Sequence, residues 1–123
     1  MVNEDKVIEN YKNAMSRLET ALEESGRSRK DVLVIGASKT MPLERILFVR
    51  DNTDVKIFGE NRVQELTQKL AEHAYDGAPV HFIGHLQTNK VKQVVGKVAL
   101  IQSVDRLELL RCIQKEAQRQ ALT

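Results

Sequence analysis

Residues 32–40 read VLVIGASKT, and this stretch decides the fold. Its first part, residues 32–37, is an apolar run rich in β-branched side chains, which is typical of a strand buried on both faces. The polar trio Ser38, Lys39 and Thr40 follows at once, and Pro42 then suits the first turn of a helix. The stretch therefore predicts a buried strand that leads through a polar loop into a helix.

The same strand, loop and helix unit recurs along the chain. Further strands are predicted at residues 55–59, 80–84 and 99–103, and each is followed by apolar residues at helical spacing. Strands that alternate with helices are joined by crossover connections, which place them in a parallel sheet. No Pro-, Gly- or Ser-rich linker interrupts this order, so residues 1–123 are predicted to form one α/β domain.

Four such units are compatible with two architectures. They form either a small open sheet or the N-terminal part of a barrel with eight strands. A partial barrel leaves two strand edges unpaired. We therefore expect such a piece to pair with a second copy of itself or with a continuation of the chain.

An additional helix is predicted before the first strand. Apolar residues recur at three- and four-residue spacing from Val7 to Leu22. Asn3 is a suitable cap for this helix, and Gly26 is a suitable end.

The later helices also carry recognisable features. The helix after the second strand is predicted to extend far enough to include Ala74 on its inner side. Thr88 is predicted to cap the helix after the third strand. Asp105 with Glu108 resembles a capping box at the start of the last helix, which is predicted to reach about residue 120.

Composition narrows the class of protein. The chain has 123 residues, of which 41% are hydrophobic, and this suits one domain with one core. The 19 Lys and Arg and 17 Asp and Glu leave a net charge of +2 without a basic block, so we expect neither a nucleic-acid nor a membrane partner. A single cysteine, Cys112, and a first segment unlike a secretion signal favour the cytoplasm.

Polar residues follow the end of every predicted strand, at residues 38–40, 60–62, 85–90 and 103–106. Binding sites in parallel α/β proteins form at this edge of the sheet. Alternation places Lys39 on one strand face with Leu33, Ile35 and Ala37. Partial desolvation on such a face disfavours the ammonium form and frees the amine to attack an aldehyde. The alternative is a lysine that is simply solvated at the end of its strand.

Other reactive side chains are interpreted as structural. His81 and His85 are separated by predicted strand, in which four residues span roughly 13 Å, too far for one metal ion. Cys112 lies among apolar residues of the last predicted helix and is expected to be a packed thiol. The free amides at residues 88–90, where a helix is predicted to begin, are the best candidate for binding an anion.

Four motifs follow one another in the chain: IGASKT at residues 35–40, FGENRVQEL at 58–66, HFIGHLQTNK at 81–90 and QSVDR at 102–106. In this order and at this spacing they resemble the YggS/PROSC family of pyridoxal phosphate homeostasis proteins. The resemblance runs over nearly the whole chain. It implies the fold of the alanine racemase N-terminal domain, a (β/α)8 TIM barrel preceded by an extra helix.

The resemblance also implies a cofactor and its site. Pyridoxal 5′-phosphate is expected as a Schiff base on Lys39 of the Ser-Lys-Thr motif. Asn61 and Ser103 resemble neighbours of the cofactor ring, and His85 is a further candidate on the same rim. In the family a fifth strand follows at about Thr123, and the phosphate-binding segments lie in that second half.

Three hypotheses stay open. The first is a non-catalytic carrier that binds pyridoxal phosphate reversibly through Lys39. The second is a racemase or decarboxylase, which needs a second acid–base group opposite the lysine, whereas Tyr11 and Tyr75 fall on predicted helices away from the strand ends. The third is a truncated half barrel that forms a homodimer through its open sheet edges and has lost the cofactor.

Overall fold

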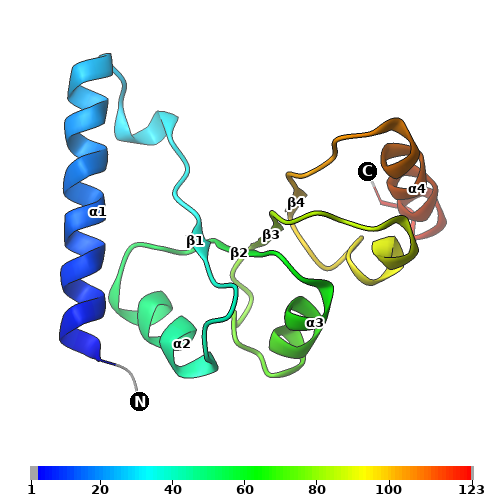
Figure 1. Ribbon diagram of the computed structural model, residues 1–123, viewed down its shortest axis with the longest axis horizontal. Helices are drawn as coiled ribbons and strands as arrows, with labels where there is room; N and C mark the ends of the chain where they lie inside the picture. The colour runs from blue at the N-terminus through cyan, green and yellow to red at the C-terminus, as the bar shows by residue number, and fades with distance from the viewer. Residues whose placement is uncertain (1–2, 123) are drawn as a thin grey trace.

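The computed structural model describes residues 3–122 and contains one parallel sheet of four short strands (Figure 1). The strands are β1 (Gly36–Ala37), β2 (Phe58–Glu60), β3 (Val80–Phe82) and β4 (Leu100–Ile101), and they lie side by side in chain order. This confirms the predicted sheet. Each strand is shorter than its predicted run because only two or three residues of each run pair with a neighbouring strand.

Helices alternate with the strands in the predicted order (Figure 1). They are α1 (Glu4–Ser25), the 3-10 helix η1 (Arg29–Asp31), α2 (Leu43–Asn52), α3 (Val63–Ala71), the 3-10 helix η2 (Thr88–Gln93) and α4 (Leu107–Arg119). Helix α1 precedes the sheet, as the sequence predicts. The arrangement is that of a partial barrel with an added N-terminal helix.

The ends of α1 are those that the sequence predicts. The Asn3 side chain accepts a hydrogen bond from the backbone N–H of Lys6 at 3.1 Å, and Gly26 ends the helix with a φ of 70°. A positive φ is the left-handed conformation that glycine adopts at little cost. Of the helix residues only Leu22 is fully buried, so α1 adds little to the core.

Three predicted helix ends are wrong. Helix α3 ends at Ala71, and Ala74 lies in the turn that follows. Thr88 is the first residue of η2 rather than its cap, which is Gln87. Arg106, not Asp105, is the N-cap of α4, and it makes no side-chain capping bond.

The segment after β3 forms the 3-10 helix η2 instead of the predicted α-helix. Its apolar residues, Val91, Val94 and Val95, are β-branched, and such side chains lose rotamer freedom in an α-helix. Gly96 then turns the chain with a φ of 85°. The helical segment therefore stops after two turns.

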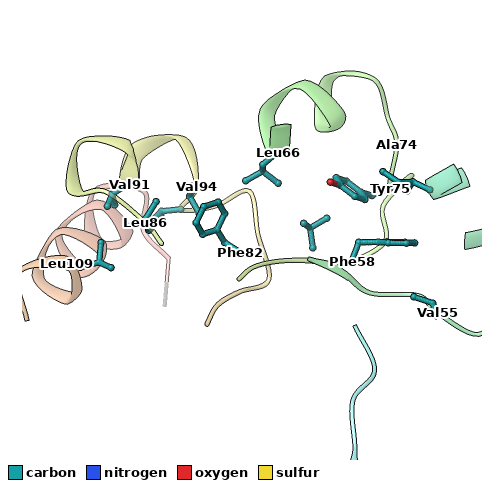
Figure 2. Close-up of a cluster of buried hydrophobic side chains, with 13 residues drawn as sticks. Val55, Phe58, Leu66, Ala74, Tyr75, Phe82, Leu86, Val91, Val94 and Leu109 are labelled. Atoms are coloured by element: carbon teal, nitrogen blue, oxygen red, sulfur yellow. The ribbon is translucent and has the colours of Figure 1, made fainter. Parts of the chain in front are cut away.

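The hydrophobic core fills the layer between the sheet and these helices (Figure 2). Phe58 and Phe82 enter it from the strands, Leu66 from α3 and Leu109 from α4. The rings of Phe58 and Tyr75 pack with their centroids 5.7 Å apart. Packing on this side fixes which strand residues face the helices.

The other face of the sheet is open, which corrects the prediction of a first strand buried on both faces. Leu33 is 61% exposed and Leu100 is 51% exposed. Ala37 is exposed as well. The helices cover only one side of the sheet, so alternate strand residues stay in contact with water.

Candidate functional site

Parallel pairing brings the four predicted site residues to the same edge of the sheet. Lys39 follows β1, Asn61 follows β2, His85 follows β3 and Ser103 follows β4. Adjacent strands lie about 4.8 Å apart, so these loops form a continuous rim. The rim lies at the carboxyl ends of the strands, where sites in such folds are built.

Lys39 lies in a tight turn at this rim and is exposed. Among residues 3–122 its ammonium group has no ion-pair or hydrogen-bond partner. The prediction of an apolar floor that partly desolvates this amine is wrong for the described residues. The strand face that Lys39 was predicted to share is itself exposed at Leu33 and Ala37.

Asn61 and Ser103 are linked through Gly84, which lies between them on the loop after β3. The Ser103 hydroxyl donates a hydrogen bond to the Gly84 carbonyl. A Cβ atom on Gly84 would stand 2.3 Å from the Asn61 carbonyl oxygen, so only glycine fits against this backbone. Three of the four loops are therefore packed together.

The Asn61 side chain has an unused acceptor. Its Oδ1 atom is buried and has no hydrogen-bond partner among the described residues. A buried acceptor without a partner costs free energy, and such atoms point to a missing donor. Asn61 is therefore able to accept a hydrogen bond from a ligand at the rim.

Asn61 and His85 both line a cavity of about 450 Å³ between α3 and η2. Arg62, Gln87 and Lys90 give this cavity polar and basic walls. Lys39 and Ser103 do not line it. The structure thus places all four candidates on one rim but does not gather them in one pocket.

A buried polar cluster beneath the rim was missed by the sequence analysis. Glu60 is 0% exposed, although the pattern groups it with the polar loop after β2. Its Oε2 atom accepts hydrogen bonds from Ser38 Oγ at 2.5 Å and from Tyr75 Oη at 2.6 Å. Lys69 Nζ lies 2.9 Å from the same oxygen. Glu60 follows Phe58 on the side of the strand that faces α3, which is why it is inside.

Tyr75 lies in the turn after α3, not on a helix, so its predicted position is wrong. Burial, and then its bond to Glu60, raises the pKa of Tyr75 well above its ordinary value. Its hydroxyl therefore stays protonated as a donor to Glu60. Tyr11 contacts Asp54, before β2, where the Asp54 backbone N–H donates to the Tyr11 hydroxyl at 3.3 Å.

Lys69 and Glu65 complete the cluster from one face of α3. Lys69 is 8% exposed, and its Nζ lies 3.2 Å from Glu65 Oε2, four residues earlier. A hydrogen bond from the Thr40 backbone N–H, followed by the Lys69 ammonium, holds the pKa of Glu65 below its ordinary value. The Glu-to-Lys spacing of four is the one signal in the sequence that indicates this pair.

The remaining predicted features have clear positions. His81 is buried with Nδ1 2.9 Å from Gln102 Nε2, whereas His85 is exposed. Within residues 3–122 no three His, Cys, Asp or Glu side chains are grouped to hold a metal ion. Cys112 is half-buried against the core, as predicted.

The anion site predicted at residues 88–90 lacks the α-helix that it requires, since η2 is a short 3-10 helix.

The chain is similar in sequence to curated bacterial proteins. A pyridoxal phosphate homeostasis protein of Aquifex aeolicus is 43% identical over 111 residues, which cover 89% of this chain and 47% of the relative. The protein of the same name from Vibrio cholerae is 36% identical and covers 81% of this chain and 44% of its own length. The chain thus spans about half the length of the curated relatives it matches. No protein-family profile matches it.

Solved structures with the same fold agree with these relatives. An unknown protein from Bifidobacterium adolescentis superposes with a TM-score of 0.86 at 28% identity, over 100% of this chain and 55% of its own. PipY of Synechococcus elongatus with pyridoxal phosphate bound superposes with a TM-score of 0.66 at 30% identity, over 84% of this chain and 49% of its own. None of the helices described is both long enough and apolar enough for a membrane span.

Proposed function

We propose that this chain, which belongs to the YggS family of pyridoxal phosphate homeostasis proteins and spans about half the length of its relatives, binds pyridoxal phosphate as a Schiff base on Lys39 without catalysing a reaction. The observation that carries the proposal is the position of an unpaired, exposed amine on the strand-end rim beside Asn61. When bound, the cofactor supplies an aldehyde carbon, which an amine attacks with loss of water.

The residues on the rim suit this ligand. The Lys39 amine is exposed and has no competing ion pair among residues 3–122, so no acidic side chain of this part of the chain holds it away from an aldehyde. Asn61 Oδ1 offers a buried acceptor that no donor within residues 3–122 reaches. Ser103 and Gly84 hold the neighbouring loop against Asn61. We assign His85 a peripheral position, because its side chain is exposed where it lines the same cavity as Asn61.

Two observations support a role without catalysis. The curated relatives are named homeostasis proteins rather than enzymes. In addition, neither tyrosine is free to move a proton at the rim, since Tyr75 donates to Glu60 and Tyr11 contacts Asp54. Racemisation or decarboxylation on a bound amino acid needs such a group opposite the lysine. We also assign the protein to the cytoplasm, where enzymes that use this cofactor draw on it.

The proposal is tested by mixing the purified chain with pyridoxal phosphate, reducing it with borohydride and mapping the labelled peptides. We expect the Schiff-base absorbance to appear and the reduced label to lie on Lys39. Lys39→Ala should lose both signals, whereas Lys115→Ala, at an exposed position on α4, should keep them. A label spread evenly over surface lysines would overturn the assignment. Turnover of an amino acid by the loaded chain would overturn the non-catalytic role.

A further inference from the structure

The turn that carries Lys39 is held from α3 on both of its sides. Residues 38–41 form a tight turn in which the Met41 backbone N–H donates to the Ser38 carbonyl at 3.1 Å. Lys39 and Thr40 are the two central residues of this turn. The carbonyl of Ser38 belongs to the peptide group before Lys39, and the N–H of Thr40 belongs to the peptide group after it.

Each of these two peptide groups is bound by a side chain of α3. Lys69 Nζ lies 2.5 Å from the Ser38 carbonyl oxygen, and Glu65 Oε2 lies 2.7 Å from the Thr40 nitrogen. The two side chains also bind each other at 3.2 Å. We propose that Lys69 and Glu65 are positioning residues, which clamp the peptide groups on either side of Lys39 and so fix the direction in which its amine leaves the backbone.

The physical basis is that a peptide group is planar, so a residue has only two soft backbone angles. Fixing the peptide planes before and after Lys39 fixes both of its angles. The Cα–Cβ direction of the lysine is then set, and only its side-chain torsions remain free. Reactions between held groups depend strongly on such placement.

Thr40 shows that the clamp acts against a local preference. Its φ is 61°, a left-handed conformation that a β-branched residue rarely adopts. Thr40 is the second of the two central residues of the turn, and a type I turn has a negative φ there. A positive φ at this position belongs to turn types in which the peptide group between the two central residues is rotated relative to type I. Glycine or asparagine is favoured at such a position. The Glu65 carboxylate holds the N–H of that same peptide. Without this bond we expect Thr40 to relax and the peptide after Lys39 to flip.

The charges of the cluster support the clamp. An ammonium group has three N–H donors, and those of Lys69 are all used, on Ser38, Glu60 and Glu65. Glu60 is fully buried and anchors Lys69 from below. The stem of Lys69 is therefore locked, which makes it a rigid support for the turn.

The first test measures amide hydrogen exchange in the cofactor-free chain, so it does not depend on ligand binding. Glu65→Ala and Lys69→Met should each raise the exchange rate of the Thr40 amide by about fivefold or more, because a hydrogen bond that holds it is lost or loosened. Two controls should leave that rate unchanged. Glu72→Ala removes an exposed acid from the end of the same helix, and Tyr75→Phe removes a bond to Glu60 without touching either peptide. Unchanged exchange in both clamp variants would overturn the inference.

The second test concerns reactivity, and in this respect the inference rests on the proposed function. After treatment with pyridoxal phosphate and borohydride, the ratio of label on Lys39 to label on the exposed Lys115 should fall by about fivefold or more in the two clamp variants. The two controls should keep the ratio of the unsubstituted chain. A loss of stability alone changes all lysines together, so it does not produce this pattern.

The two failures are distinguishable. If the unsubstituted chain shows no preference for Lys39, the proposed function is wrong, and the exchange measurement alone decides whether the clamp exists. If Lys39 is preferred and the clamp variants keep that preference despite faster exchange, then Lys69 and Glu65 hold the turn without directing the amine, and the positioning role is wrong.

Discussion

Glu60 and Lys69 form a buried ion pair whose members depend on each other. Taking a charged group out of water is costly unless a partner and hydrogen bonds compensate, and here Ser38 and Tyr75 supply the additional bonds. The Glu60 Oε1 atom has no partner among residues 3–122. The cluster therefore supports local geometry more than overall stability.

This dependence predicts an asymmetric response to substitution. Glu60→Ala should destabilise the chain by about 3–5 kcal/mol, because it removes the buried carboxylate of the pair and leaves the Lys69 ammonium with Glu65 as its remaining acidic partner. The double variant Glu60→Leu with Lys69→Met should lose less, since it removes both charges and keeps apolar volume. Urea unfolding followed by circular dichroism measures both. Equal losses in the single and double variants would show that the pair does not act as a unit.

Gly84 provides a second prediction at the scale of one residue. Gly84→Ala should cost about 1–3 kcal/mol, because the new methyl group meets backbone atoms of Asn61 rather than the end of a flexible side chain. Gly36→Ala should cost less, since its methyl group would meet a side-chain atom of Val55 at 2.9 Å. Denaturant midpoints of the two variants give the comparison. A larger loss for Gly36→Ala would contradict the close packing of the loops.

At the scale of the element, helix α4 is attached to the loop before β4 by its last turn. Gln120 Nε2 binds the Val95 carbonyl at 3.3 Å and Glu116 Oε2 at 2.7 Å. Arg119 binds the same carboxylate through two nitrogens. Hydrogen bonds from Arg119 and then Gln120 lower the pKa of Glu116 from 4.5 to about 2. This carboxylate therefore connects the helix end to the core.

The lowered pKa of Glu116 predicts how stability depends on pH. A group whose pKa falls on folding stabilises the folded state fully above its unfolded value and loses that effect as pH falls through its folded value. Glu116→Gln should therefore be less stable than the unsubstituted chain at neutral pH. The gap should close as pH falls from 4.5 towards 2. Thermal unfolding across this range measures it.

Glu19→Gln is the control for this pH series. Glu19 is exposed in α1 and makes no ion pair among residues 3–122. Glu19→Gln should differ little in stability from the unsubstituted chain, and this difference should stay the same over the same pH range. A gap for Glu116→Gln that persists unchanged at pH 2 would contradict the assigned bonds.

At the scale of the whole molecule, the sheet is covered by helices on one side only. Two leucines are more than half exposed: Leu33, which lies before β1, and Leu100, which lies in β4. The two edge strands also carry backbone groups that no strand within residues 3–122 pairs with. Apolar side chains and open edges of this kind favour association with another chain.

We therefore predict that the chain self-associates in solution. Its mass by sedimentation should rise with concentration, and Leu100→Asp should shift the equilibrium towards the monomer by placing a charge on the exposed apolar strand. Gln114→Asp, at an exposed site on α4, adds the same charge away from the sheet and is the control for the change in charge. A strictly monomeric mass at every concentration would contradict the prediction.

Much of this molecule is determined by local patterns in the sequence. The apolar runs with their alternating helical segments are enough to predict four parallel strands, the added first helix and the edge at which Lys39, Asn61, His85 and Ser103 lie. The order of the four motifs is enough to predict the family. These features depend on the spacing of residues that are close in the chain, and such spacing is visible without a structure.

Only the tertiary structure decided which polar residues of the strand ends are inside and which are on the rim. Glu60 and Asn61 are adjacent in the chain, yet the first is buried beneath α3 and the second lies at the rim. Lys69 and Tyr75 reach Glu60 from 9 and 15 residues away. Contacts across such separations depend on how a strand packs against its helix, and a one-residue difference reverses the face of a side chain, so local spacing does not determine them.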